Sequence, residues 1–272
     1  MATFSFNPTG MGAVDRATLL AAFDAELRPG LFKDYGPNGL QVEGREKIRK
    51  IVSGVTASRA LIDAAVAAGA DAIFVHHGLF WRGQSGCVTG WMKERLKRLL
   101  AHEVNLFAYH LPLDAHPTLG NNAQLGERLG LRTTARFGEQ ELGFLGEVVS
   151  GGGGGGGGGG ALADAGALAA RVEQVLARSV TLVGPVRGAV ERVAWCSGGA
   201  QGYFEAAIEA GAQAFITGEI SEPQAHLARE CGVSFLACGH HATERYGAPA
   251  MAAHVAAQYG IEHEFIDIEN PA

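Results

Sequence analysis

Apolar residues follow two alternating patterns along this chain. Short, mostly apolar runs predict buried strands, and stretches with apolar residues three and four positions apart predict amphipathic helices. We expect strands over 51–55, 71–75, 104–109 and 132–137, and helices over 14–27, 58–68, 91–101, 122–129 and about 242–259. Strands that alternate with helices predict an α/β fold with a largely parallel sheet and helical crossovers.

The second half of the chain repeats the pattern of the first. Residues 61–75 and 203–217 are identical at six of fifteen positions, and most other positions keep their residue class. The flanking strands also fall into register, in the pairs 51–55 with 193–197 and 105–109 with 234–238. Alanine-rich helices can match by chance, so coincidence is the alternative to duplication. We predict two similar α/β domains related by an internal repeat, 13–138 and 139–272.

Ten consecutive glycines, Gly151–Gly160, stand between the two halves. Glycine loses more backbone entropy on ordering than any other residue, so such a run is not expected to hold one conformation. It is either a flexible linker or a placeholder in which unidentified residues are written as glycine, and no function is drawn from it.

Composition narrows the classes of partner. The chain has 272 residues, 47% of them hydrophobic and 18% charged, which is ordinary for a globular protein with a large core. The formal net charge of −6 argues against a nucleic-acid partner, because DNA-coating surfaces neutralise phosphates with many cations.

Cysteine usage and the start of the chain predict a cytoplasmic protein. The four cysteines lack metal-type spacing and are interpreted as small buried thiols in a reducing compartment: Cys87, Cys196, Cys231 and Cys238. The amino terminus has no basic segment followed by an apolar core, and no run is long enough to span a membrane.

Histidines and carboxylates gather near the ends of the predicted strands. They are His76 and His77 after one strand, His110 and Asp114 in the loop that follows the next, and His240 and Glu244 after the corresponding strand of the second half. Open α/β sheets place their ligand sites at the carboxyl ends of parallel strands. Each residue also has an ordinary interpretation, such as a core histidine, a turn cap for Asp114, or a Glu244 that complements a helix dipole.

Taken together, these six residues predict a metal site. Imidazoles and carboxylates suit zinc, manganese or iron, and this number of donors accommodates two ions. Two ions can activate a water and stabilise a developing oxyanion. Other motifs are weaker: residues 197–202 are better explained as a tight strand-to-helix turn than as a phosphate loop, and Phe80, Trp81 and Trp91 either stack on a ligand or pack at an interface.

Five ordered motifs resemble the NIF-three-like dinuclear-metal family, whose bacterial members are often labelled GTP cyclohydrolase 1 type 2 homologs. The motifs are Asn38–Val42, Val75–Gly78, His110–His116, Gly120–Asn122 and Gly239–Arg245. The resemblance implies two similar α/β domains, a dinuclear site between them, and a homohexamer built as a trimer of dimers. By the same resemblance His76 and Asp114 would hold one ion, His77 and His240 the other, and Glu244 would bridge them.

Two functions follow from this resemblance. The first is a metal-dependent hydrolase acting on GTP or another purine nucleotide, with two divalent ions per chain, Glu244 as a bridging catalytic residue and His110 as a proton carrier. The alternative is a metal-binding or metal-handling hexamer without catalysis. A nucleic-acid adaptor is disfavoured by the acidic charge.

Overall fold

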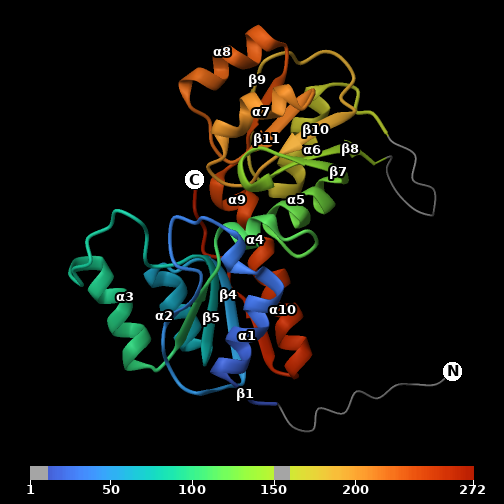
Figure 1. The fold of residues 1–272 in the computed structure, drawn as a ribbon. Coiled ribbons are helices and arrows are strands. Elements are labelled where there is room, and N and C mark those ends of the chain that lie inside the picture. Colours follow the sequence, from blue (N-terminus) through green and yellow to red (C-terminus); the bar gives the residue numbers. More distant parts are fainter. Residues whose placement is uncertain (1–11, 150–159) are drawn as a thin grey trace, which may run out of the picture. The chain divides into compact units, whose positions relative to one another are not determined.

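The computed structural model describes residues 12–149 and 160–272 and divides into two compact units (Figure 1). Unit 1 comprises Met1–His110 and Met251–Ile268, and unit 2 comprises Leu111–Ala250 and Glu269–Ala272. These bounds differ from the predicted 13–138 and 139–272, because residues 111–138 belong to unit 2 and the chain returns to unit 1 after residue 250. The glycine run falls outside the described residues, except for Gly160.

Unit 1 contains a five-stranded sheet in the order β13-β4-β5-β6-β2 among its described residues. The strands β4, β5, β6 and β13 are parallel, and β2 pairs antiparallel with β6. The elements are β1 (Val14–Asp15), α1 (Arg16–Leu27), η1 (Pro29–Leu31), β2 (Gly39–Val42), β3 (Lys47–Ile48), β4 (Lys50–Thr56), α2 (Arg59–Ala67), β5 (Ala72–His77), α3 (Gly90–Ala101), β6 (Asn105–Ala108) and β13 (Glu262–Phe265). Helix α10 (Gly247–Tyr259) begins in the residues of unit 2 and ends in unit 1.

Both faces of this sheet are covered, as continuous apolar strands require. Figure 1 shows α2 and α3 on one side of β4 and β5, and α1 and α10 on the other. Alternate strand residues divide between the faces: Ile73 and Val75 join the core with α2 and α3, whereas the ring of Phe74 lies 4.5 Å from that of Phe23 in α1. The sheet is therefore a buried central layer whose strand ends can carry polar groups.

Unit 2 contains a six-stranded sheet in the order β7-β8-β10-β11-β12-β9. Strands β10, β11 and β12 are parallel and the outer pairings are antiparallel. The elements are α4 (Leu111–Ala115), α5 (Asn121–Leu129), β7 (Leu131–Phe137), η2 (Glu139–Glu141), β8 (Gly143–Val148), α6 (Ala165–Leu176), β9 (Thr181–Val183), β10 (Arg192–Trp195), η3 (Gln201–Tyr203), α7 (Phe204–Glu209), β11 (Ala214–Thr217), α8 (Glu222–Cys231), β12 (Ser234–Ala237) and α9 (His240–Glu244).

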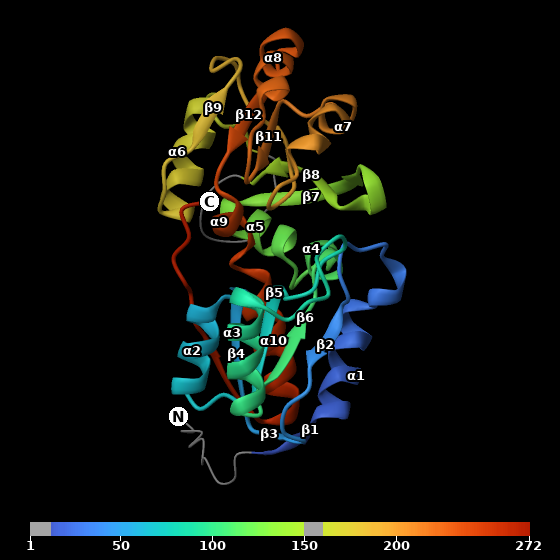
Figure 2. The same ribbon diagram turned by 90° about the vertical axis from the view of Figure 1, so that its left-hand side faces the viewer.

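The core of unit 2 also has two sides. Leu168 and Val172 of α6 pack with Trp195 and Ile216 of the sheet, while the ring of Phe204 in α7 lies 5.8 Å from that of Phe215 on the opposite face. Figure 2 shows α6 and α7 on opposite sides of β11 and β12. The chain therefore has the mixed α/β fold that the sequence pattern predicts.

Strands β4, β5 and β6 of unit 1 pair in registers equivalent to those of β10, β11 and β12 of unit 2. In unit 1 Ile51 pairs with Ala72, and in unit 2 Val193 pairs with Ala214. Each pair occupies the positions that the sequence match sets against each other. The duplication itself stays a prediction.

Three local expectations are wrong. The helix expected to run from about Ala242 to Tyr259 is interrupted at residues 245–246, which gives α9 and α10. Residues 111–115, expected as a loop, form the short helix α4, because proline is tolerated in a first helical turn. His76 and His77 do not follow β5 but are its last two residues.

No helix among the residues that the structure describes is long and apolar enough to cross a membrane.

Candidate functional site

Three histidines of unit 1 lie together at the carboxyl ends of β5 and β6. His76 and His77 end β5, and His110 lies just beyond β6. The ring centroids of His76 and His77 are 4.4 Å apart, and that of His110 is 4.9 Å from His76 and 5.7 Å from His77. His76 is fully buried, whereas the other two are partly exposed.

Each of these rings is held through its Nδ1 atom. His76 Nδ1 lies 3.1 Å from the carbonyl oxygen of Tyr109, and His77 Nδ1 lies 3.0 Å from Thr56 Oγ1. Tyr109 is the residue after β6 and Thr56 ends β4, so the strands on both sides of β5 orient its two histidines. A hydrogen bond at one ring nitrogen fixes the ring and leaves the other nitrogen for a ligand.

His110 is held by a buried carboxylate. Its Nδ1 atom lies 2.7 Å from Asp34 Oδ1, and the Asp34 side chain is only 3% exposed. The backbone N–H of His110 donates to Asn38 Oδ1 at 2.7 Å. Burial raises the pKa of Asp34, but the hydrogen bonds and charge of His110, with further hydrogen bonds from Asn38 and Tyr35, outweigh it and lower the pKa to about 2.

This histidine group can bind a metal ion. One ligand atom from each of His76, His77 and His110 lies within 4.8 Å of the other two. Imidazole nitrogen is a common ligand of zinc, iron and other borderline divalent metals. The donor set of unit 1 therefore fits the predicted type of cofactor, although metal identity and number do not follow from it.

In unit 2, two asparagines hold Asp114 in α4. Asn121 Nδ2 donates to Asp114 Oδ1 at 2.8 Å, and Asn122 Nδ2 donates to its carbonyl oxygen at 3.3 Å. Ser197 Oγ donates to the same carboxylate at 3.2 Å. The sequence suggests helix caps for these asparagines, but the N-cap of α5 is Gly120 and both asparagines are fully buried beside Asp114.

His240 and Glu244 are the first and last residues of the short helix α9. His240 Nε2 lies 3.1 Å from Glu244 Oε2, and His240 Nδ1 lies 2.6 Å from Glu219 Oε1. Gly198 approaches this pair so closely that a Cβ atom there would overlap the Glu244 carboxylate. Since φ of Gly198 is +68°, glycine suits both the conformation and the contact.

The charges around this pair favour a cationic His240. The hydrogen bond to Glu244 raises the pKa of His240 to about 9, in opposition to desolvation, and Glu219 adds to the rise. Carboxylates stabilise a bound divalent metal ion as they stabilise the protonated His240, because both are cations. The buried carboxylates of Asp114 and Glu244 are therefore suitable metal ligands.

The structure places each predicted site residue in one of these two groups. His76, His77 and His110 belong to unit 1, and Asp114, His240 and Glu244 belong to unit 2.

The residues that hold these side chains were not predicted, above all Asp34, Thr56 and Glu219. Glu219 was detectable, because the internal match sets it opposite His77. Asp34 and Thr56 carry no local signal, since their partners lie 76 and 21 positions away.

The remaining candidates have structural roles. Residues 197–200 lie in the predicted turn after β10, and residues 201–202 begin η3. Phe80 packs against the core of unit 1, and Trp91 is 56% exposed with the Arg95 guanidinium 4.8 Å from its ring centre. The expectation of buried thiols holds for Cys196 and Cys238 and is wrong for Cys87 and Cys231, which are exposed.

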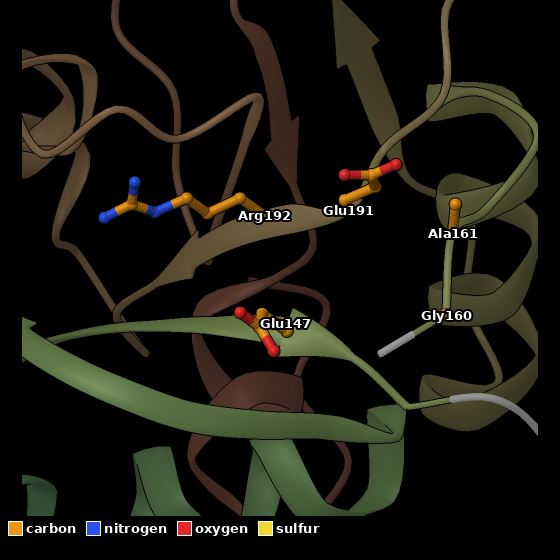
Figure 3. A pocket seen from close by; sticks show the side chains of 5 residues that line it. All are labelled: Glu147, Gly160, Ala161, Glu191 and Arg192. Atoms are coloured by element: carbon orange, nitrogen blue, oxygen red, sulfur yellow. The ribbon is translucent and has the colours of Figure 1, made fainter. Parts of the chain in front are cut away.

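A cavity of unit 2 lies away from the strand ends near Asp114, His240 and Glu244. It measures about 390 Å³ and is lined by Glu147, Glu191 and Arg192, together with Gly160 and Ala161 (Figure 3). Arg192 is the first residue of β10, whereas Ser197 and Gly198 follow its carboxyl end. The cavity therefore belongs to the opposite edge of the parallel strands.

Comparison with known proteins identifies relatives of this α/β protein. The family model described as Duf34/NIF3 (NGG1p interacting factor 3) matches residues 14–271. A Neisseria meningitidis protein named GTP cyclohydrolase 1 type 2 homolog is 53% identical over 94% of this chain and 99% of its own length. An Escherichia coli protein of the same name is 47% identical over 91% of this chain and 95% of its own.

Solved structures have the same fold. One titled protein ybgI, of unknown function, is 44% identical, with a TM-score of 0.87 over 95% of this chain and all of that chain. The protein TTHA1606 from Thermus thermophilus is 32% identical, with a TM-score of 0.83 over the same shares. The chain belongs to the Duf34/NIF3 family.

Proposed function

We propose that this chain binds two divalent metal ions and hydrolyses a small substrate, with a purine nucleotide such as GTP as the first candidate. The observation that carries the proposal is the orientation of the unit 1 histidines. A carbonyl oxygen and a carboxylate can only accept hydrogen bonds, so His76 and His110 donate through Nδ1 and present Nε2 as the ligand or base. The name shared by relatives supports the choice of GTP.

The proposed ligands come from both units. His76 and Asp114 would hold one ion, His77 and His240 the second, and Glu244 would bridge them. Support comes from within each unit, where second hydrogen bonds orient the side chains: Thr56 holds His77, Asn121 holds Asp114, and Glu219 holds His240. When bound, such a pair of ions supplies Lewis-acid activation of water and stabilisation of an oxyanion.

The chain's own residues supply proton transfer and positioning. His110 is partly exposed and would accept a proton from the attacking water at Nε2, then return it to the leaving group. The fully buried His76 would stay fixed by the carbonyl oxygen of Tyr109.

The decisive experiment is a Glu244→Gln substitution with Glu222→Gln as its control. Glu222 lies on α8 with its side chain 80% exposed, so the control makes the same chemical change on the surface. Each protein is stripped with a chelator and reloaded separately with zinc, manganese or ferrous iron. Metal content is then measured by elemental analysis, and products from GTP and a nucleotide panel by chromatography.

We expect about two metals per chain and turnover for the native protein and Glu222→Gln, and loss of both for Glu244→Gln. Full turnover in Glu244→Gln would refute the mechanism. Exchangeable metal without any product in the native protein would refute the hydrolase and favour a metal-handling assembly.

We further propose a cytoplasmic homohexamer, arranged as a trimer of dimers, on the basis of family membership. Light scattering after size-exclusion chromatography should give six times the chain mass of 28.3 kDa. A monomer or dimer at micromolar concentration would refute the assembly, and recovery of the protein in the membrane or extracellular fraction would refute the location.

A further inference from the structure

The turn from Asp34 to Asn38 forms two hydrogen bonds with His110, one to its ring and one to its backbone. The Asp34 carboxylate meets the ring at Nδ1, and the Asn38 side-chain oxygen accepts the backbone N–H of the same histidine. The turn and the histidine are more than 70 positions apart in the sequence. The contact is therefore a feature of the folded unit rather than of local chain geometry.

Three donors converge on the Asp34 carboxylate. The N–H of Tyr35 and Nδ1 of His110 both meet Oδ1, at 2.6 and 2.7 Å, and Nδ2 of Asn38 donates to Oδ2 at 2.9 Å. A carboxylate has only acceptor sites, so the histidine must supply the proton. These hydrogen-bond directions assign the proton of neutral His110 to Nδ1 and its lone pair to Nε2.

The surrounding structure leaves this arrangement little freedom. Arg82 Nη2 donates to the carbonyl oxygen of Asp34 at 2.7 Å, and Gln41 Nε2 donates to that of Pro37 at 2.7 Å. The cavity that His110 lines with Trp81 measures only about 10 Å³, which is space for about one water molecule. The ring of Trp81 also meets His110 edge-on, with centroids 5.0 Å apart.

We propose that Asp34 is the positioning residue of His110 and that, with Asn38, it sets the histidine tautomer that presents the Nε2 lone pair. The tautomer assignment stands on the hydrogen bonds alone. Its consequence for proton transfer rests on the proposed hydrolase function. In that reaction Asp34 touches neither substrate nor metal and acts through the ring of His110.

Asp34→Asn is the informative substitution because it keeps the size and changes only the hydrogen-bond directions. If the new amide oxygen faces Tyr35 and His110, its NH₂ group meets the Asn38 donor. If the amide is flipped, its NH₂ meets the N–H of Tyr35 and offers a proton to His110 Nδ1. Rotation of the Asn38 amide would set its NH₂ against the backbone N–H of His110. In every orientation one donor therefore faces another donor. The flipped amide of the Asp34→Asn variant also donates to Nδ1 of His110, so the ring proton moves to Nε2.

The test is magic-angle-spinning NMR of metal-free protein labelled with ¹⁵N at histidine, at about pH 9, more than two units above the pKa of an unperturbed histidine. His110 is assigned by its absence from the spectrum of His110→Gln. Asp63→Asn is the control: this carboxylate pairs with Arg98 Nε at 2.6 Å on the surface of unit 1. Thermal unfolding shows whether each variant folds.

In native protein and in Asp63→Asn, we expect His110 to be protonated at Nδ1 and unprotonated at Nε2. In Asp34→Asn, we expect at least half of His110 to be protonated at Nε2. Native His110 with its proton at Nε2 would overturn the proposal, and this measurement needs no variant to fold. Unchanged Nδ1 protonation of His110 in a folded Asp34→Leu variant, which has no acceptor at this position, would also overturn it.

Kinetics separate this proposal from the proposed function. If the protein is a hydrolase, Asp34→Asn should lower kcat about 100-fold or more with KM little changed. Loss through KM alone would overturn the positioning role. If the native protein turns over no substrate, the hydrolase is refuted while the tautomer assignment is still decided by the NMR spectra.

Discussion

Substitution of Asn122 by alanine tests whether the buried asparagines of α5 hold Asp114 and its surroundings in unit 2. The Asn122 side chain accepts a hydrogen bond from the backbone N–H of Ser197 at 2.8 Å and donates to the carbonyl oxygens of Asp114 and Leu142, each at 3.3 Å. It is fully buried, so alanine would leave these groups without a nearby water.

The expected destabilisation is about 2 kcal/mol. Loss of a partner for a buried N–H such as that of Ser197 costs about 1–3 kcal/mol. The two longer bonds to Asp114 and Leu142 add less, and the higher helix propensity of alanine returns about 0.5 kcal/mol. For a domain of 150 to 250 residues, a net loss of about 2 kcal/mol corresponds to a fall in Tm of about 4–8 °C.

Calorimetry of the metal-free protein measures this change, with Gln124→Ala as the control. Gln124 lies on the same helix and donates to the carbonyl oxygen of Thr118 near the surface. Its replacement should change the free energy of unfolding by less than about 0.5 kcal/mol. Equal shifts in Tm for the two variants would show that the buried network contributes nothing beyond helix propensity.

Three further outcomes are expected. Gly198→Ala should lower the free energy of unfolding by at least about 1 kcal/mol, because Gly198 has a positive φ and a Cβ atom would overlap Glu244. Gly202→Ala, where a Cβ atom has open space, should be neutral, and equal Tm values for the two variants would refute the close contact. Tyr109→Phe removes the 2.6 Å hydrogen bond to Asp24 and should cost about 1.5–3 kcal/mol in urea unfolding, and an unchanged midpoint would contradict this. Metal at one hundred times its Kd should stabilise chelator-treated protein by about 2.7 kcal/mol, and a constant Tm would exclude binding to the folded state.

The central elements of both units are readable from the sequence because their signals are local. Apolar runs and helical spacing predict β4, α2 and β5 to within a few residues. Strand β13 is not predicted, because its segment Glu262–Phe265 is largely polar and forms a strand by pairing with β4. Lys50 of β4 contacts both Glu262 and Glu264 at 2.7 Å, so contacts distant in sequence create this strand.

The candidate site divides in the same way. The six predicted residues were found because histidines and carboxylates near strand ends are visible without a structure. The residues that orient them through hydrogen bonds were not found, since Asp34 and Asn121 look like ordinary turn and cap residues in the sequence. Only the folded units show that these side chains orient His110 and Asp114.

The return of the chain to unit 1 has a consequence for its synthesis. Strand β4 ends at Thr56, but β13, which pairs with it, begins only at Glu262. At about 5–20 residues per second, the ribosome needs roughly 10–40 s to make the intervening 200 or so residues. During that time β4 exposes an open edge that can pair with another nascent chain. Unit 2 lies almost entirely within 111–250 and can complete its sheet first.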